Sequence, residues 1–158
     1  VSPPDREQPV RGFWGGDWDA AANRQRALDT AKAETESDPT NGFAWFNLGS
    51  NLVYFERYSE AAEAYDEARK LRLPQRMLRY QFGPFIAYFH TNRIDDLNTL
   101  ADYALQITAN AEEALLWKGW ALYRQGKRDE AIAMFQKALE ERPGYVDAQY
   151  ALNFVVNN

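Results

Sequence analysis

The first residue to test for chemistry is His90, which is the single histidine of the chain. A histidine can act as a general acid or base near neutral pH, or ligate a metal ion, but both roles need partner side chains. The chain has no cysteine, and the carboxylates that could serve fall at the predicted ends of helices. A catalytic or metal-binding role for His90 is therefore disfavoured. The residue is expected to line a groove or to lie near a turn.

Two acidic pairs, Asp95-Asp96 and Glu112-Glu113, are the next candidates for chemistry. Each pair falls where a helix is predicted to begin, and carboxylates there interact favourably with the positive end of the helix dipole. Glu140-Glu141, at a predicted helix end, is interpreted as a solvated pair. The sequence contains neither a glycine-rich phosphate loop followed by Lys and Ser or Thr nor a nucleophile elbow. We therefore interpret the chain as non-enzymatic, with no metal site and no cofactor.

Composition narrows the classes of partner. The net charge of −5 and the pI near 5.0 argue against nucleic acid and against an anionic membrane surface, because no basic stripe is present. No apolar run reaches the length of about 18 residues that a membrane-spanning helix needs. At 158 residues with 46% hydrophobic side chains, the chain can bury a continuous core.

The elements that must position these side chains are clearest between Glu112 and Tyr145. This stretch is predicted to form two amphipathic helices joined by a tight turn at Gln125-Gly126-Lys127. Small residues alternate with large ones at the spacing by which two helices approach closely and fill the wedge between them. These packing positions are Gly119, Leu122, Gly126, Ala131, Phe135, Ala138 and Pro143. One such hairpin cannot bury its apolar face alone, so further copies are expected.

The copies recur along the chain. Ala27 and Ala61 are 34 residues apart, Ala61 and Leu97 are 36 apart, and Leu97 and Ala131 are again 34 apart. A two-residue insertion near residues 75–77 accounts for the single offset. The predicted organisation is an extended linker (1–16) and a repeat domain (17–158), the latter divided into a leading helix (17–40), a repeat (41–75), a degenerate repeat (78–111), a repeat (112–145) and a capping helix (146–158).

The degenerate repeat contains Gly83-Pro84 where the sequence predicts the inside of its first helix. Proline lacks an N–H group and its ring crowds the carbonyl four residues earlier, here that of Tyr80. A kink or a break of the helix is expected at this point.

Several motifs resemble those of the tetratricopeptide-repeat family over roughly residues 17–158. Trp45, Leu48, Gly49 and Leu52 match the pattern W-xx-L-G-xx-L, and Ala131, Phe135 and Ala138 match A-xxx-F-xx-A. The resemblance implies an all-α, right-handed superhelical stack of antiparallel helix hairpins, with about three repeats plus capping helices and seven or eight helices in all. It also implies that the first helix of each hairpin lines an inner groove that binds a protein or a peptide.

Carried over by register, the resemblance places an aromatic wall in that groove. Its lining would be Phe43, Phe46, Ser50, Val53, Tyr54, Arg79, Phe82, Ile86, Phe89, His90, Glu113, Leu116, Trp120, Tyr123 and Arg124, extended by Tyr150 and Phe154. The ligand contacts expected from this set are Phe43, Phe46, Tyr54, Arg79, Phe82, Phe89, His90, Trp120, Tyr123 and Arg124. The alternative is that helix curvature buries half of these side chains in the core. The two cations and two asparagines that clamp a C-terminal carboxylate in co-chaperones have no match, so a chaperone-tail ligand is not predicted.

A narrower likeness lies in the segments AWFNLGS, LPQRMLRYQFGPFIAYF and EEALLWKGWAL. They look like the repeat tail of certain bacterial secreted or surface-anchored proteins, where the tail follows a papain-like cysteine peptidase domain of the bacteriocin-processing type. This likeness implies an extracytoplasmic bacterial location, with residues 1–10 joining the repeats to such a domain. Two functions stay open: a module that binds a separate protein or peptide, and a regulatory or structural tail that packs in cis on the adjoining peptidase domain.

The aromatic segment from Phe13 to Trp18 departs from this pattern. Trp14, Gly15 and Trp18 lie 34 residues before Leu48, Gly49 and Leu52, so the segment resembles a worn first helix of a leading repeat. The alternative is a segment that folds over the aromatic wall or over a neighbouring molecule. We favour packing on the first helix, which leaves the groove open for a partner.

Overall fold

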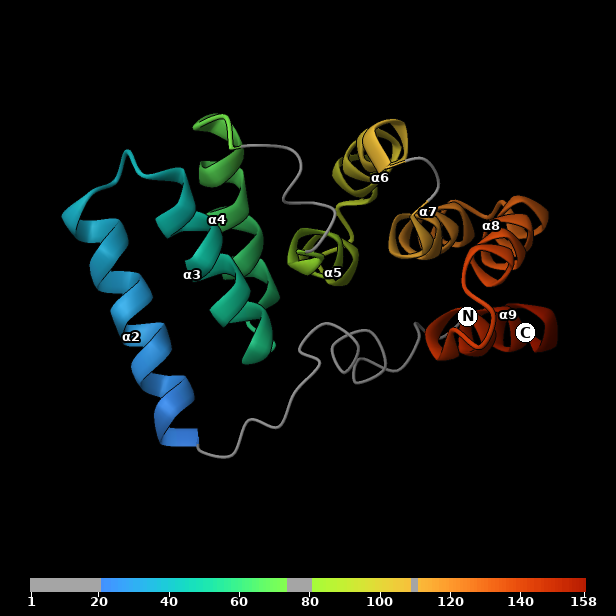
Figure 1. Cartoon of the computed structure of the whole chain (residues 1–158), viewed down its shortest axis with the longest axis horizontal. Coiled ribbons are helices and arrows are strands. Elements are labelled where there is room, and N and C mark those ends of the chain that lie inside the picture. Colours follow the sequence, from blue (N-terminus) through green and yellow to red (C-terminus); the bar gives the residue numbers. More distant parts are fainter. Residues whose placement is uncertain (1–20, 74–80, 109–110) are drawn as a thin grey trace.

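The computed structural model describes residues 21–73, 81–108 and 111–158. Within these ranges the chain forms eight helices and no strand, as the sequence predicts. In chain order they are α2 (Ala21–Ser37), α3 (Gly42–Tyr54), α4 (Tyr58–Lys70), α5 (Gly83–His90), α6 (Ile94–Thr108), α7 (Glu112–Arg124), α8 (Arg128–Glu141) and α9 (Val146–Asn157) (Figure 1). None of the described helices is long and apolar enough to cross a lipid bilayer.

The helices pack as successive hairpins, α3 on α4, α5 on α6 and α7 on α8, with α2 against α3 and α9 against α8 (Figure 1). The first helices α3, α5, α7 and α9 also contact one another in order. Among the described residues, by contrast, the backbones of α2, α4, α6 and α8 do not approach one another closely, and α4 and α6 meet through side chains. The stack therefore curves, with the first helices on its inner side and the second helices spread along its outer side.

The two helices of a hairpin approach each other closely at glycine residues. Gly49 of α3 lies against the ring of Tyr65 of α4, and Gly119 of α7 lies against the ring of Phe135 of α8. Both rings are buried, with exposed fractions of 1% and 0%. The prediction that these glycines mark close helix contacts is confirmed.

The N-terminal ends of the helices carry the capping and acidic side chains that stabilise such ends. Asn41 caps α3, and its side-chain oxygen accepts from the backbone N–H of Phe43 at 3.0 Å. Asp95 and Asp96 lie in the first turn of α6, and Glu112 and Glu113 lie in the first turn of α7. Both acidic pairs thus occupy the positions predicted for them, where the helix dipole favours negative charge.

The middle repeat differs from the prediction. Gln81 and Phe82 are not helical, α5 begins at Gly83, and Pro84 lies in its first turn. The expected place of Pro84 inside a longer helix is wrong, because the helix begins one residue before it. The first turn suits proline because an N–H at that position has no partner within the helix to lose. The carbonyl of Tyr80, which was expected to lose its partner, lies outside the described residues.

A cluster of hydrogen bonds and ion pairs links α5 to α4 and to the start of α6. Arg93, just before α6, donates to both carboxylate oxygens of Asp66 on α4, at 2.7 and 2.9 Å. The buried Tyr88 of α5 donates its hydroxyl to Asp66 at 2.7 Å and accepts from Arg69 at 3.2 Å. Asp96 pairs with both arginines, at 3.1 Å from Arg69 and 2.8 Å from Arg93. We call these five residues the α4–α6 network.

Candidate functional site

One register position of the repeat carries a polar or aromatic side chain in three successive first helices. Tyr54, His90 and Arg124 are the last residues of α3, α5 and α7, and they follow one another at separations of 36 and 34 residues. Because these helices pack side by side, the three residues form a row along the inner side of the stack. We call it the inner row.

At Tyr54 the row meets the preceding helix. The guanidinium of Arg24 on α2 lies 4.7 Å from the centre of the Tyr54 ring. Burial lowers the pKa of Arg24, against the opposing effect of the Tyr54 hydroxyl. The arginine nevertheless stays charged near neutral pH, since its ordinary pKa is so high. The pair is a cation–π contact that fixes the Tyr54 ring, which stays partly exposed.

At the middle of the row, the imidazole of His90 packs against two aromatic rings. Its imidazole stacks on the ring of Tyr58 with centroids 4.3 Å apart and planes 18° apart, and it meets Phe89 edge-on at 5.4 Å. The turn at Thr91 and Asn92 follows directly, which agrees with the prediction of a side chain near a turn. These contacts hold the imidazole in one orientation.

Arg124 ends the row, and it is exposed. Its guanidinium lies 4.6 Å from the centre of the Phe89 ring and donates to the side-chain oxygen of Asn92 at 3.2 Å. Among the described residues it forms no ion pair with a carboxylate. The head group is thus positioned by an aromatic face and an amide, with donors left for an acidic partner.

An aromatic cluster continues the inner side toward the C-terminal end. The rings of Trp120 and Tyr123 on α7 both meet Phe154 of α9 edge-on, at 5.8 and 5.9 Å, and Tyr150 stacks on Phe154 at 6.3 Å. Trp120 is only 2% exposed, whereas Tyr123, Tyr150 and Phe154 are partly exposed. The hydroxyl of Tyr123 has no hydrogen-bond partner within the part of the chain that the structure describes.

Residues 112–145 match the family model described as tetratricopeptide repeat. The stack has the tetratricopeptide-repeat fold. Among solved structures, YrrB, described as a tetratricopeptide-repeat protein with an unusual peptide-binding site, aligns over 86% of this chain and 69% of its own, with 23% identity and a TM-score of 0.70. MamA aligns over 99% of this chain and 85% of its own, with 15% identity and a TM-score of 0.72. No curated protein matches the chain. The comparisons give no support to the narrower likeness to a peptidase tail.

Six of the predicted wall residues are buried in the core of the repeat stack. Phe46, Phe89 and Trp120 are 7%, 0% and 2% exposed, and Val53, Ile86 and Leu116 are buried as well. Phe46, for example, packs edge-on against Tyr65 of α4 at 5.1 Å, inside its own hairpin. The predicted continuous aromatic wall is therefore corrected: curvature buries its centre, and the accessible residues lie at the ends of the first helices.

The remaining predicted residues divide between the inner row and other places. Phe43 is 55% exposed but lies at the opposite end of α3 from Tyr54. Phe82 precedes α5 and stacks on Phe85 at 6.4 Å, so it belongs to the repeat junction. Arg79 lies outside the described residues. The row thus retains Tyr54, His90 and Arg124 from the prediction, with Tyr123 beside it.

Three partners of the row escaped sequence reasoning, namely Arg24, Tyr58 and Asn92. Each contacts a row residue or its neighbour from another helix or turn, 30 to 32 positions away in the sequence. Arg24 and Asn92 belong to no repeat motif, and Tyr58 is predicted only to lie on the packing face of the second helix of its repeat, with no sign of a contact to His90. Asn92 at a positive φ of 59° was the one with a local signal, because it follows a helix end where a left-handed residue is common.

A half-buried acid lies near the start of α7. Burial raises the pKa of Glu113 to about 7, against the neighbouring hydroxyl of Tyr145, which favours the charged form. The charges of Asp147 and Glu112 raise it further. Among the described residues no group of three or more His, Asp or Glu side chains is placed to hold a metal ion.

Proposed function

We propose that this chain is a non-catalytic scaffold that binds a segment of a partner protein or a peptide along its inner side. The observation that carries the proposal is the inner row, in which one register position holds Tyr54, His90 and Arg124 in three successive repeats. A row that repeats with the helices suits a ligand that runs across them, with one contact for each repeat.

The chemistry of the row favours an extended segment with aromatic and acidic side chains. Tyr54 offers a ring held by Arg24, and Tyr123 and Phe154 offer partly exposed rings. Arg124 offers a positioned guanidinium without a carboxylate partner among the described residues. Aromatic and arginine side chains are the residues that most often dominate binding energy at protein interfaces.

The comparison with YrrB supports a peptide ligand, since that protein shares the fold and is described as having a peptide-binding site. The likeness extends to the fold and not to the site, because only 23% of the aligned residues are identical. The ligand class therefore rests on the side chains of this chain.

The alternative is that the same face packs in cis on an adjoining cysteine peptidase domain of a longer polypeptide. In this alternative the inner row is again the binding surface, and the partner is a domain of the same polypeptide instead of a separate protein or peptide. The coding sequence upstream of Val1 distinguishes the two hypotheses, since the alternative requires a peptidase domain there.

The binding proposal is tested by panning a random peptide library, displayed on phage, against the whole chain. The affinities of enriched peptides are then measured by fluorescence anisotropy. The variant combining Tyr54→Ala and Arg124→Gln should weaken binding by at least about tenfold, because it removes two anchors.

Arg26→Gln is the matched control, since Arg26 is an exposed arginine of α2 whose side chain bonds, among the described residues, only to Asn23 in its own helix. It should leave the affinity unchanged. Circular dichroism establishes that every variant is folded. Enriched peptides that bind the double variant as tightly as the parent chain would overturn the proposal, as would a panning that enriches no peptide.

A further inference from the structure

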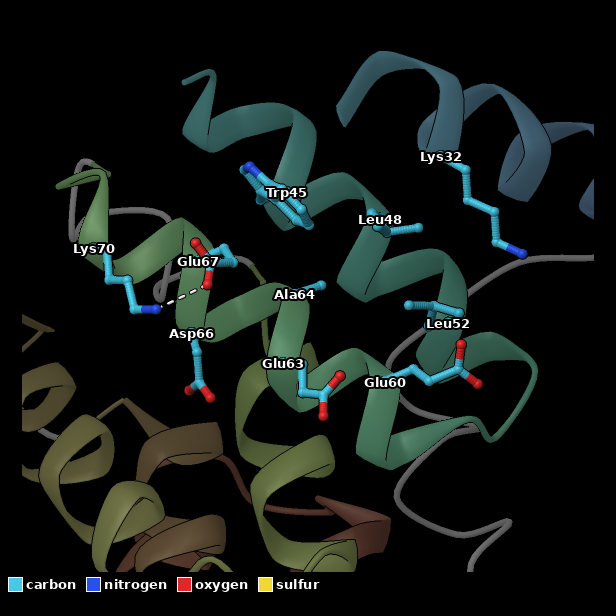
Figure 2. Close-up of a pocket in the computed structure, with 10 residues that line it drawn as sticks. All are labelled: Lys32, Trp45, Leu48, Leu52, Glu60, Glu63, Ala64, Asp66, Glu67 and Lys70. Carbon is cyan, nitrogen blue, oxygen red and sulfur yellow. Dashed lines mark hydrogen bonds and ion pairs between the residues drawn. The ribbon is translucent and has the colours of Figure 1, made fainter. Parts of the chain in front are cut away.

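The curvature that brings the first helices together separates the second helices and opens the outer side of the stack. Helices α2 and α4 each pack on α3, and their backbones do not approach each other closely. Between them runs an open groove of 470 Å³ (Figure 2). We call it the outer groove. The residues that matter for its chemistry are Lys32, Trp45, Leu48, Glu60, Glu63 and Glu67.

The floor of the outer groove is apolar and comes from α3. Trp45 lies there with its ring partly exposed, and Leu48 lies beside it (Figure 2). The indole N–H of Trp45 donates to the carbonyl of Pro39 at 2.8 Å, which fixes the orientation of the ring. A fixed, partly exposed tryptophan is a preorganised contact for an apolar side chain of a ligand.

One wall of the outer groove is acidic. Glu60, Glu63 and Glu67 follow one another on α4 at spacings of 3 and 4 residues, so they share one face of the helix, as Figure 2 shows. The cations of the lining are Lys32 of α2, on the opposite wall, and Lys70 of α4, beside Glu67. The groove therefore combines an apolar floor with an excess of negative charge along one edge.

The ion pairs of Glu60 and Glu67 within the chain leave the acidic wall able to bind an external cation. Glu60 bonds to Arg57 at 2.6 Å, and Glu67 bonds to Lys70 at 2.8 Å, both three residues away on exposed surface. Such pairs exchange partners at little cost, because exposed ion pairs contribute at most about 1 kcal/mol. Glu63 has no ion-pair partner among the described residues.

The neighbouring outer groove, between α4 and α6, differs. Arg69 lies along it, together with Asp66, which lines both grooves, and both residues belong to the α4–α6 network, where Asp96 and Arg93 neutralise them. Its charges are thus satisfied within the chain. Of these two grooves, only the one between α2 and α4 is lined by a carboxylate, that of Glu63, without an ion-pair partner among the described residues.

We propose that the outer groove binds a cationic amphipathic segment of a partner protein. Apolar side chains of the segment pack on Trp45 and Leu48, and its lysines or arginines pair with Glu63 and Glu67. This surface lies on the other side of the stack from the inner row, so the proposal goes beyond the peptide-binding function and does not depend on it. The chain then joins two partners at once.

The probe is a blocked peptide of leucines and lysines, with the leucines at helical spacing and a length of about 14 residues, which covers one helix of the repeat. Its counterpart carries glutamate in place of every lysine. Binding to the isotope-labelled whole chain is followed by NMR, where the indole N–H of Trp45 reports on the groove and those of Trp117 and Trp120 report on the buried core.

The lysine peptide should shift the Trp45 indole signal and leave those of Trp117 and Trp120 unchanged, while the glutamate peptide should not bind. The combined variant Glu63→Gln and Glu67→Gln should weaken binding by about tenfold, and added salt should weaken it further. The matched control is Glu140→Gln with Glu141→Gln, which removes the same charge from the exposed end of α8. It should leave the affinity unchanged.

Several outcomes overturn the proposal. Equal weakening by both double variants would show attraction to net charge alone, and equal binding of the two peptides would show no charge selection. Absence of binding, or shifts confined to the inner row, would remove the groove as a site. A Trp45 signal that moves with protein concentration before peptide is added would assign the groove to a second copy of the chain.

Discussion

The ring of Phe135 lies across Gly119 so closely that no side chain fits between them. A Cβ atom added to Gly119 would lie 2.4 Å from Cε1 of Phe135. The ring is fully buried and packs edge-on against Trp120 at 5.1 Å, so it has little room to withdraw. The same relation recurs between Gly49 and Tyr65, where the corresponding distance is 2.7 Å.

Replacement of Gly119 by alanine should therefore lower the free energy of unfolding by about 1–3 kcal/mol, and leucine should cost more, because both overpack the hairpin. Urea denaturation measures the change. In a chain that already carries Phe135→Leu, the cost of Gly119→Ala should be smaller, since the flat ring is gone. Equal costs in the two backgrounds would contradict the contact.

The hydroxyl of Tyr88 joins two charged partners, since it donates to Asp66 and accepts from Arg69. Tyr88→Phe keeps the buried ring but removes both bonds, and it should destabilise the chain by about 1 kcal/mol. Thermal unfolding followed by circular dichroism measures the effect. Tyr103→Phe is the matched control because Tyr103 is 38% exposed, and a change there should stay within about 0.5 kcal/mol. A loss of the same size in both variants would contradict the role of the network.

The register of the hairpins could be predicted because small and large side chains recur at fixed spacings in the sequence. Gly119 and Ala131 are small and Phe135 is large at fixed spacings, and the structure places all three at one helix contact. The accessible part of the inner side could not be predicted in the same way. Register tells which face a residue occupies, but the depth of Phe46 or Trp120 depends on how closely successive hairpins approach.

Contacts between residues far apart in the chain could not be predicted, because no local sequence pattern indicates them. Asp66 and Arg93 are 27 positions apart, and Tyr58 and His90 are 32 apart, yet both pairs are central to the middle repeat. Their residue types are ordinary for solvated helix faces. Only the packing of α5 against both α4 and α6 brings them together.

Pro84 provides a test of where α5 begins. Because it lies in the first turn, Pro84→Ala removes no strain and should change the free energy of unfolding by at most about 1 kcal/mol. Ala87→Pro, in the interior of the same helix, should cost about 3 kcal/mol or more. Chemical denaturation of the two variants compares them. A large stabilisation by Pro84→Ala would indicate that the proline distorts a longer helix.

Glu113 should make the stability of the chain depend on pH. Its pKa in the folded chain is about 7, compared with an ordinary value of 4.5, because burial favours the protonated acid. Between these values the folded state binds more protons than the unfolded state, so stability is highest at the acidic end and falls as the pH rises toward 7. Above that pH the folded chain carries the full cost of a half-buried charge, which is on the order of 3 kcal/mol.

Glu113→Gln should remove this dependence, since glutamine stays neutral at every pH. The variant should be as stable as the parent chain near pH 4 and more stable near pH 8, and urea denaturation at a series of pH values measures the difference. Comparison with the parent cancels groups that titrate in both chains, such as Asp66, whose pKa is held low by Arg93 and Tyr88 in spite of burial. Glu112→Gln is the control, because it removes the neighbouring acid and should leave most of the slope in place. A parent and a Glu113→Gln variant with parallel stability curves would show that Glu113 is already ionised in the folded chain at acidic pH.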